Sequence, residues 1–163
     1  RNAQLAQAGI LRDKLRLCQQ LEAELAQGEA IDGAAWSARW EALPPLAAEY
    51  ETVLRARLQS ALGAAAAEGR GQYVHRLEEN REALLQEVLR LEIAAGVDSG
   101  AEFARERLKL QVEVLQTSLK SGQKPLTQSA QFLQLCTLPA LADARTSSRI
   151  EHLFARIFGK DHK

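Results

Sequence analysis

The sequence contains no methionine, and only two of its 163 residues are cysteines. Cys18 and Cys136 lie far apart, so they make neither a disulfide framework nor a zinc site, and they fit a reducing compartment. We therefore expect a cytoplasmic protein. Because the chain begins at Arg1 and lacks methionine throughout, we also expect it to be a fragment or a processed product of a longer protein.

Long apolar runs and an excess of one charge are missing as well. No stretch approaches the roughly 20 apolar residues of a membrane-spanning helix, and no signal peptide opens the chain. The 21 basic and 21 acidic residues cancel, which argues against a protein that binds polyanions over its whole surface. We expect no membrane partner.

Signals for strands and for common catalytic motifs are also missing. Apolar and polar residues do not alternate, and no Asn-Gly hairpin turn occurs. His75, His152 and His162 lack metal-binding spacing, and there is no Walker A loop, Rossmann glycine motif or nucleophile elbow. The sequence therefore predicts a protein that is not an enzyme and uses no metal, cofactor or small-molecule substrate.

Helical periodicity dominates the sequence instead. Apolar residues recur at three- and four-residue steps along most of the chain, which is the spacing of one helix face. This pattern predicts an all-α helical bundle of about six helices. Among them are helices over residues 2–27, 72–95, 100–121 and 126–137.

Turn and capping residues mark the expected helix boundaries. Gly96 and Gly122 suit the left-handed conformation that commonly ends a helix. The segments Ser99–Glu102 and Ser148–Glu151 have the spacing of a capping box, so we expect a helix to begin at each. Pro44-Pro45 suits a further helix start, because the first turn does not use the N–H that proline lacks.

Two short patterns occur twice. Leu21-Glu22 reappears 70 positions later as Leu91-Glu92, and Leu43-Pro44-Pro45-Leu46 reappears 95 positions later as Leu138-Pro139-Ala140-Leu141. The two offsets differ by about the length of the expected helix 100–121. We therefore predict a diverged three-helix unit that is used twice.

The predicted organisation has residues 1–71 as the first helical unit and residues 72–163 as the second. Helix 100–121 is an insertion in the second unit. Each unit alone would leave an apolar stripe exposed, and stacking removes that stripe from water at about 25 cal/mol per Å². We expect the stacked units to share one continuous core.

The two tryptophans lie on one helix face. Trp36 and Trp40 are one helical turn apart, and Leu43 extends the same face. We expect them in the core; the alternative is an exposed stacking platform beside Arg39.

Helix 100–121 carries an unusually wide apolar face, so we expect it to be packed on two sides. Its apolar residues are Phe103, Leu108, Leu110, Val112, Val114, Leu115 and Leu119.

Two glutamates lie close to apolar stripes. Glu22 and Glu92 must be paired or hydrogen-bonded, because burial of an unpaired carboxylate costs several kcal/mol. Arg81 lies on the same side of helix 72–95 and is the expected partner. We interpret these residues as fixing the packing, because acid–base catalysis needs a cleft and a second catalytic group that the sequence does not show.

Charge is uneven along the chain. Residues 1–99 hold 11 basic and 15 acidic groups, a net charge of −4, whereas residues 100–163 hold 10 basic and 6 acidic groups, a net charge of +4. The basic end is suited to phosphates or to an acidic partner, although a solvated helix surface is the alternative. The candidate binding residues are Arg105, Arg107, Lys109, Lys120, Lys124, Arg149, Arg156 and Lys160.

Several segments resemble a bacterial family named domain of unknown function 349. They are Leu17-Cys18-x-x-Leu21-Glu22, Trp36-x-x-x-Trp40-x-x-Leu43-Pro44, Leu89-Arg90-Leu91-Glu92-Ile93-Ala94-Ala95-Gly96-Val97-Asp98-Ser99, Arg105-x-Arg107-Leu108-x-Leu110-Gln111-Val112 and Leu135-Cys136-x-Leu138-Pro139. The resemblance spans most of residues 11–158 and looks like the C-terminal part of such proteins. It implies a helical, cytoplasmic, repeat-containing bacterial protein and assigns no catalytic residue.

These observations predict a non-enzymatic interaction or scaffold module that binds a protein partner through its helix faces. The alternative is a nucleic-acid or ribosome-associated module that uses the basic C-terminal part.

Overall fold

The structure is an all-α bundle, as the sequence predicts. The computed structural model describes residues 2–66, 68–122, 124 and 126–159, with side chains from residue 7 onward. Within these residues there are seven α-helices, one short 3-10 helix and no strands. The helices are α1 (Asn2–Ala26), α2 (Gly33–Glu41), α3 (Ala48–Ala66), α4 (Arg70–Ala95), η1 (Ala101–Phe103), α5 (Ala104–Ser121), α6 (Gln128–Cys136) and α7 (Ala144–Phe158).

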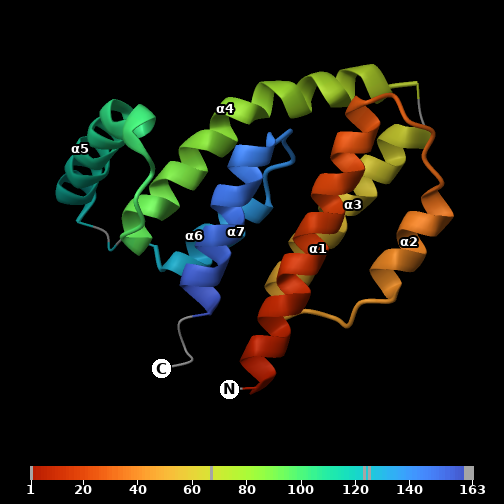
Figure 1. Cartoon of the computed structure of the whole chain (residues 1–163), viewed down its shortest axis with the longest axis horizontal. Coiled ribbons are helices and arrows are strands. Elements are labelled where there is room, and N and C mark those ends of the chain that lie inside the picture. Colours follow the sequence, from red (N-terminus) through yellow and green to blue (C-terminus); the bar gives the residue numbers. More distant parts are fainter. Residues whose placement is uncertain (1, 67, 123, 125, 160–163) are drawn as a thin grey trace.

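Helix α4 spans two groups of helices (Figure 1). Under one half lie α1 and α3, with α2 against α1; under the other half lie α6 and α7. Further contacts join α1 to α7 and α3 to α6. The two groups therefore form one body, with α4 as their common element. None of the described helices has both the length and the apolar character that crossing a membrane requires.

Most of the buried apolar side chains form one cluster that runs through both groups. Leu21 of α1, Leu91 of α4 and Leu153 of α7 are all fully buried in it. Trp36 and Trp40 are buried in the same cluster, which confirms the expected core position and excludes an exposed stacking platform.

A buried lysine of α1 pairs with Glu51 of α3, which also binds the backbone just before α3 begins. The Lys14 ammonium lies 2.7 Å from a carboxylate oxygen of Glu51 and 4.5 Å from the centre of the Trp40 ring. Glu51 also accepts a hydrogen bond from the backbone N–H of Leu46. Burial acts to raise the pKa of Glu51, but the hydrogen bonds from Lys14 and Leu46 outweigh it and lower that pKa.

Two predicted helix starts are wrong. Helix α3 begins at Ala48 and not at Pro44-Pro45. Pro44 is followed by a second proline, and the residue before a proline is disfavoured in the helical conformation. Helix α7 begins at Ala144. Asp143 caps it, accepting from the backbone N–H of Thr146 at 2.7 Å, so Ser148 lies inside the helix.

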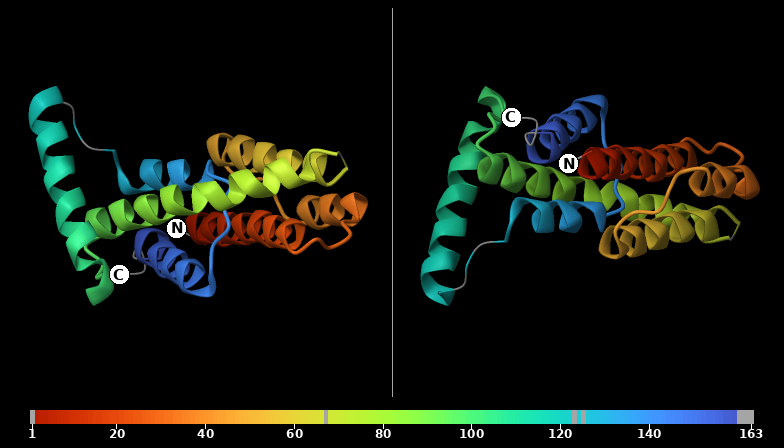
Figure 2. Two further views of the ribbon diagram at one scale, coloured as in Figure 1. Left: turned by 90° about the horizontal axis from the view of Figure 1, so that it is seen from above. Right: turned by 90° about the horizontal axis from the view of Figure 1, so that it is seen from below.

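The predicted capping box at Ser99 is also wrong. The Ser99 hydroxyl donates to Glu92 and accepts from Arg107, and no side chain caps η1 or α5. Gly96 ends α4 in the left-handed conformation, as predicted. Gly100 has φ +97° and ψ 152°, a region that is essentially restricted to glycine. The chain turns sharply between these two glycines, and α5 then lies across the end of α4 (Figure 2).

We expect the Asp143 cap to make stability depend on pH in the acid range. The backbone N–H of Thr146 lowers the pKa of Asp143. The stabilisation is therefore present above the unfolded pKa of about 3.9 and is lost as the pH falls through the lower folded value. An Asp143→Asn variant retains a capping oxygen but does not titrate.

Urea unfolding of both proteins between pH 7 and pH 3 tests this cap. The free energy of unfolding of the parent, minus that of Asp143→Asn, should fall as the solution becomes more acidic than about pH 4. A difference that stays constant over this range would show that the cap does not depend on ionised Asp143. An Asp143→Ala variant, which lacks the cap, should lose about 1 kcal/mol at pH 7.

Candidate functional site

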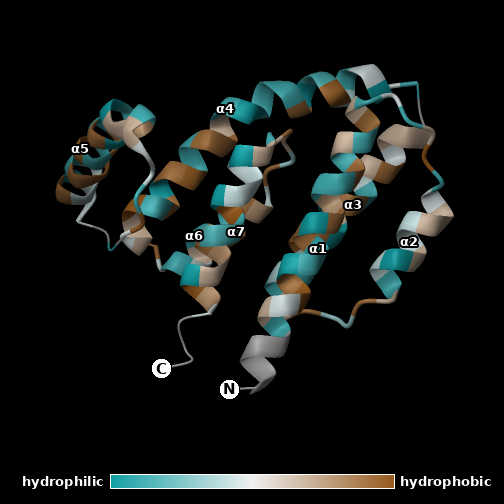
Figure 3. Cartoon of the chain, in the orientation of Figure 1, coloured by the Kyte–Doolittle hydropathy of each residue, from teal (hydrophilic) through white to brown (hydrophobic). Residues whose placement is uncertain are grey.

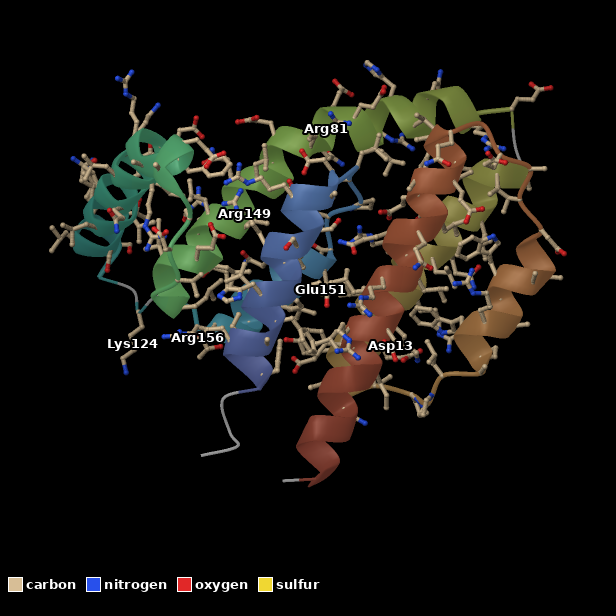
Figure 4. All side chains as sticks on the ribbon, viewed as in Figure 1. Asp13, Arg81, Lys124, Arg149, Glu151 and Arg156 are labelled. Atoms are coloured by element: carbon tan, nitrogen blue, oxygen red, sulfur yellow. The ribbon has the colours of Figure 1, made fainter. Side chains whose placement is uncertain are left out.

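The structure divides the predicted basic binding residues into two classes. Five of them are exposed: Arg105, Lys109 and Lys120 on α5, Lys124 after it, and Arg156 on α7 (Figure 4). Arg107 and Arg149 are half-buried and hydrogen-bonded within the fold. Lys160 lies outside the described residues. The exposed cations are spread over separate elements, and on α5 they alternate with Glu106 and Glu113.

Arg107 and Arg149 belong to a polar network at the end of α4. The Glu92 carboxylate, which is 2% exposed, accepts from Arg149 Nε at 3.0 Å and from Ser99 Oγ at 2.7 Å. Arg107 donates to Ser99 Oγ at 2.7 Å and to the Val97 carbonyl. The network therefore ties α5 and α7 to α4, and these two arginines are bound internally.

Ring and ion-pair contacts also hold η1 against α7. The Arg149 guanidinium lies 4.2 Å from the centre of the Phe103 ring. Glu102 forms a bidentate ion pair with Arg145 of α7, which also lies over Phe103. This exposed pair lowers the pKa of Glu102 through hydrogen bonds from the Arg145 guanidinium.

Glu22 is paired with Arg57 of α3, and the predicted role of Arg81 is wrong. Arg57 donates from Nε and Nη2 to the two carboxylate oxygens of Glu22, each at 2.7 Å, and from Nη1 to the Cys136 carbonyl at 3.0 Å. Arg81 is exposed on α4 and makes none of the described hydrogen bonds to Glu22 or Glu92 (Figure 4). Arg57 of α3 pairs with Glu22, and Arg149 of α7 pairs with Glu92, so each carboxylate already has a cationic partner.

Burial and pairing have opposite effects on Arg57. Burial acts to lower the pKa of its guanidinium, but the adjacent Glu22 carboxylate outweighs burial and raises that pKa. Arg57 is therefore held as a charged guanidinium beside the Glu22 carboxylate. It lies in the core and packs α1, α3 and α6 together.

The two thiols next to this pair are not nucleophiles. Burial raises the pKa of Cys18 to about 12 and that of Cys136 to about 12. Both cysteines are free, and Cys18 donates to the Leu54 carbonyl. Nucleophilic cysteines need the thiolate, so this environment keeps both thiols unreactive in the folded protein.

One hollow in the surface is large enough to be a candidate site. It is an open depression of about 560 Å³ between α3 and α4, where Tyr73, Arg76 and Asn80 are the main polar residues. Burial raises the pKa of Tyr73 to about 12, so its hydroxyl stays protonated. Asn80 donates to the Pro139 carbonyl and is therefore engaged in packing. Among the described residues, no group of histidine, cysteine or acidic side chains is placed to hold a metal ion.

The outer face of α5 is the most unusual surface of the molecule. Leu110 is the only residue of this helix that is buried, at 2% exposure, so the expectation of packing on two sides is wrong. The side chains in this apolar stripe are exposed by 63% at Leu108, 46% at Val112, 60% at Leu115 and 76% at Leu119. We call these four residues the α5 stripe.

The α5 stripe faces away from the bundle. With 100° of rotation per residue, its four members lie about 140–180° around the helix from Leu110, the buried residue of α5. Figure 3 shows hydrophobic residues along α5, which lies at the edge of the bundle beside the end of α4. Val114 and Leu126 add further exposed apolar surface nearby in the sequence.

Comparisons of this chain with protein-family models, with curated proteins and with solved structures give no match. A function must therefore be inferred from these residues. The apolar spacing of the sequence predicted the α5 stripe, but the expectation that this helix is packed on two sides is wrong. The sequence did not indicate that Arg57, which lies on a different helix, is the partner of Glu22.

Proposed function

We propose that this chain is a non-enzymatic helical interaction module of a larger bacterial protein, of the kind it resembles in sequence, and that it binds a protein partner through α5. The observation that carries the proposal is the exposed α5 stripe. Its function is recognition, with no chemical step.

The size of the stripe supports this role. Its four side chains leave on the order of 400 Å² of apolar surface in water, comparable with the largest patches of monomeric proteins, which are often functional. Removing that area from water is worth about 10 kcal/mol before the costs of association are subtracted. A partner that has its own apolar helix face could cover the stripe, and the complex would be stabilised by this removal of apolar surface from water.

The nucleic-acid alternative has less support. Arg107 and Arg149 are held inside the fold, which leaves the exposed cations dispersed over α5, α7 and the segment after α5. Nucleic-acid surfaces usually concentrate such cations on one face. We therefore favour the protein-binding function, in a cytoplasmic setting that suits the two free cysteines.

We further infer that the fold consists of two diverged three-helix units, α1–α3 and α4, α6 and α7, with α5 inserted into the second. In support, the first helix of each unit holds the third through a bidentate pair, Glu22–Arg57 and Glu92–Arg149. The paired residues are 35 and 57 positions apart, and the difference of 22 is close to the length of the inserted segment. The proposed units correspond to the predicted ranges 1–71 and 72–163, with the boundary moved to the start of α4 at Arg70. Both units contribute to the single core.

Site-specific photo-crosslinking in bacterial cells tests the proposed function. A photoreactive apolar amino acid at Leu115 places the probe in the stripe, and the same amino acid at exposed Gln59 of α3 is the matched control. We expect a discrete protein adduct from position 115 and none from position 59. The adduct should disappear when Leu108 is also changed to Gln.

Two results would contradict the proposal. One is the absence of a protein adduct from positions 108, 115 and 119; the other is an adduct equally strong from position 59. Crosslinks to RNA alone, together with binding that weakens steeply as salt is raised, would instead support the nucleic-acid alternative.

A further inference from the structure

We propose that the occupant of the α5 stripe is the α5 stripe of a second copy of this chain, paired antiparallel. This inference rests on the proposed protein-binding function and names the partner. It follows from the spacing of the stripe, the charges beside it and the face of α5 that the bundle leaves open.

The stripe is self-complementary when two copies run in opposite directions. Its members are spaced by four, three and four residues, which places them alternately at the two core positions of a heptad. Antiparallel pairing puts Leu108 opposite Leu119 of the other copy, and Val112 opposite Leu115. Every member then faces another member about a two-fold axis, as a closed symmetric dimer requires.

The charges at the ends of the stripe favour the same direction. Arg105 lies seven residues, one heptad, before Val112. In the antiparallel pair, Arg105 is level with Gly122 of the other copy. Gly122 ends α5, where the exposed carbonyls attract a cation. Parallel pairing would instead place the two Arg105 side chains next to each other.

The flanking residues are compatible with this arrangement. Antiparallel pairing brings Lys109 beside Gln116 on one side of the seam and Gln111 beside Ser118 of the other copy on the other side. No like charges meet along either flank. The open side of α5 also permits the approach, because Leu110 and Arg107 attach the opposite side to the bundle.

The small buried area is typical of weak, reversible interfaces. Two copies of the stripe with their flanks would remove on the order of 1,000 Å² from solvent, at the lower edge of stable interfaces. We therefore expect a reversible dimer with a dissociation constant on the order of 10 µM. Such a dimer is visible only when the protein is concentrated.

Analytical ultracentrifugation of the intact chain, from about 1 µM to about 500 µM, measures this equilibrium. Leu115→Glu should raise the dissociation constant at least about 100-fold, because pairing then buries unpaired carboxylates. The control Thr117→Glu, exposed on another face of α5, should leave it within about twofold. A chain that stays monomeric throughout, or a Leu115→Glu variant that dimerises like the parent, overturns the proposal.

Disulfide trapping tests the direction of the pairing. In an equimolar mixture of Leu108→Cys and Leu119→Cys chains, the disulfide should join the two different variants. Two copies of residue 108 lie about 16 Å apart along the axis of an antiparallel pair, beyond the roughly 7 Å between Cα atoms that a disulfide spans. Cys18 and Cys136 are buried and do not contribute. Trapping mainly within each single variant would indicate parallel pairing and overturn the proposal.

Self-pairing and binding of another protein give different results in these experiments. A monomeric chain whose position 115 still crosslinks to a different protein overturns self-pairing and leaves the proposed function standing. A monomeric chain that also gives no protein adduct removes both.

Discussion

Replacing Arg57 with methionine should destabilise the protein by about 3–5 kcal/mol. Glu22 is completely buried and receives two hydrogen bonds from the Arg57 guanidinium. Arg57→Met leaves this carboxylate without its partner in the core, and the Cys136 carbonyl also loses a donor. The measurement is the free energy of unfolding from urea titration followed by circular dichroism.

A double variant separates the lost pair from lost packing. Glu22→Leu combined with Arg57→Met removes both charges, so most of the stability lost in Arg57→Met should return. The matched surface control is Arg16→Met, which breaks a half-exposed ion pair to Glu151 and should cost less than about 1 kcal/mol. A loss in Arg57→Met no larger than that in Arg16→Met would refute a structural role for the buried pair.

Phe132→Ala should cost about 3–5 kcal/mol, because it opens a cavity at the junction of α6 and α7. Phe132 is fully buried, and its ring centre lies 5.9 Å from that of Phe154 and 5.3 Å from that of Phe158 in edge-on contacts. Such aromatic pairs add about 0.5–1.5 kcal/mol each beyond the buried area. Urea unfolding at low protein concentration gives the free energy without a contribution from association.

Leu108→Ala on the α5 stripe is the matched control for an apolar truncation. Leu108 is mostly exposed, so the change should alter the free energy of unfolding by less than about 0.5 kcal/mol. If Phe132→Ala were as mild as Leu108→Ala, the aromatic contacts between α6 and α7 would not stabilise the bundle.

Local and periodic features of this fold are predictable from the sequence. The helical class follows from apolar spacing, and Gly96 and Gly122 end their helices because each adopts the left-handed conformation. Trp36 and Trp40 fall in the core because their spacing matches one helix face. Helix starts are less predictable because candidate caps compete. Asp143, which precedes Ser148 in the chain, caps α7 in its place.

Partners between helices are not predictable from a single sequence. Glu22 required a cation, but the rotation and crossing of three helices decide that Arg57 reaches it and Arg81 does not. The α5 stripe poses the same problem at a larger scale. An apolar face predicts that something covers it, and its spacing does not say whether the cover comes from the same chain.

The contact between α1 and α7 has a consequence for synthesis on the ribosome. Arg16 and Glu151 are 135 positions apart, so α1 and α7 can meet only after the intervening segment and α7 have been translated. Until then the nascent α1–α3 segment lacks its α7 cover and is open to chaperones and aggregation. Slow translation between α5 and α7 would prolong that vulnerable interval.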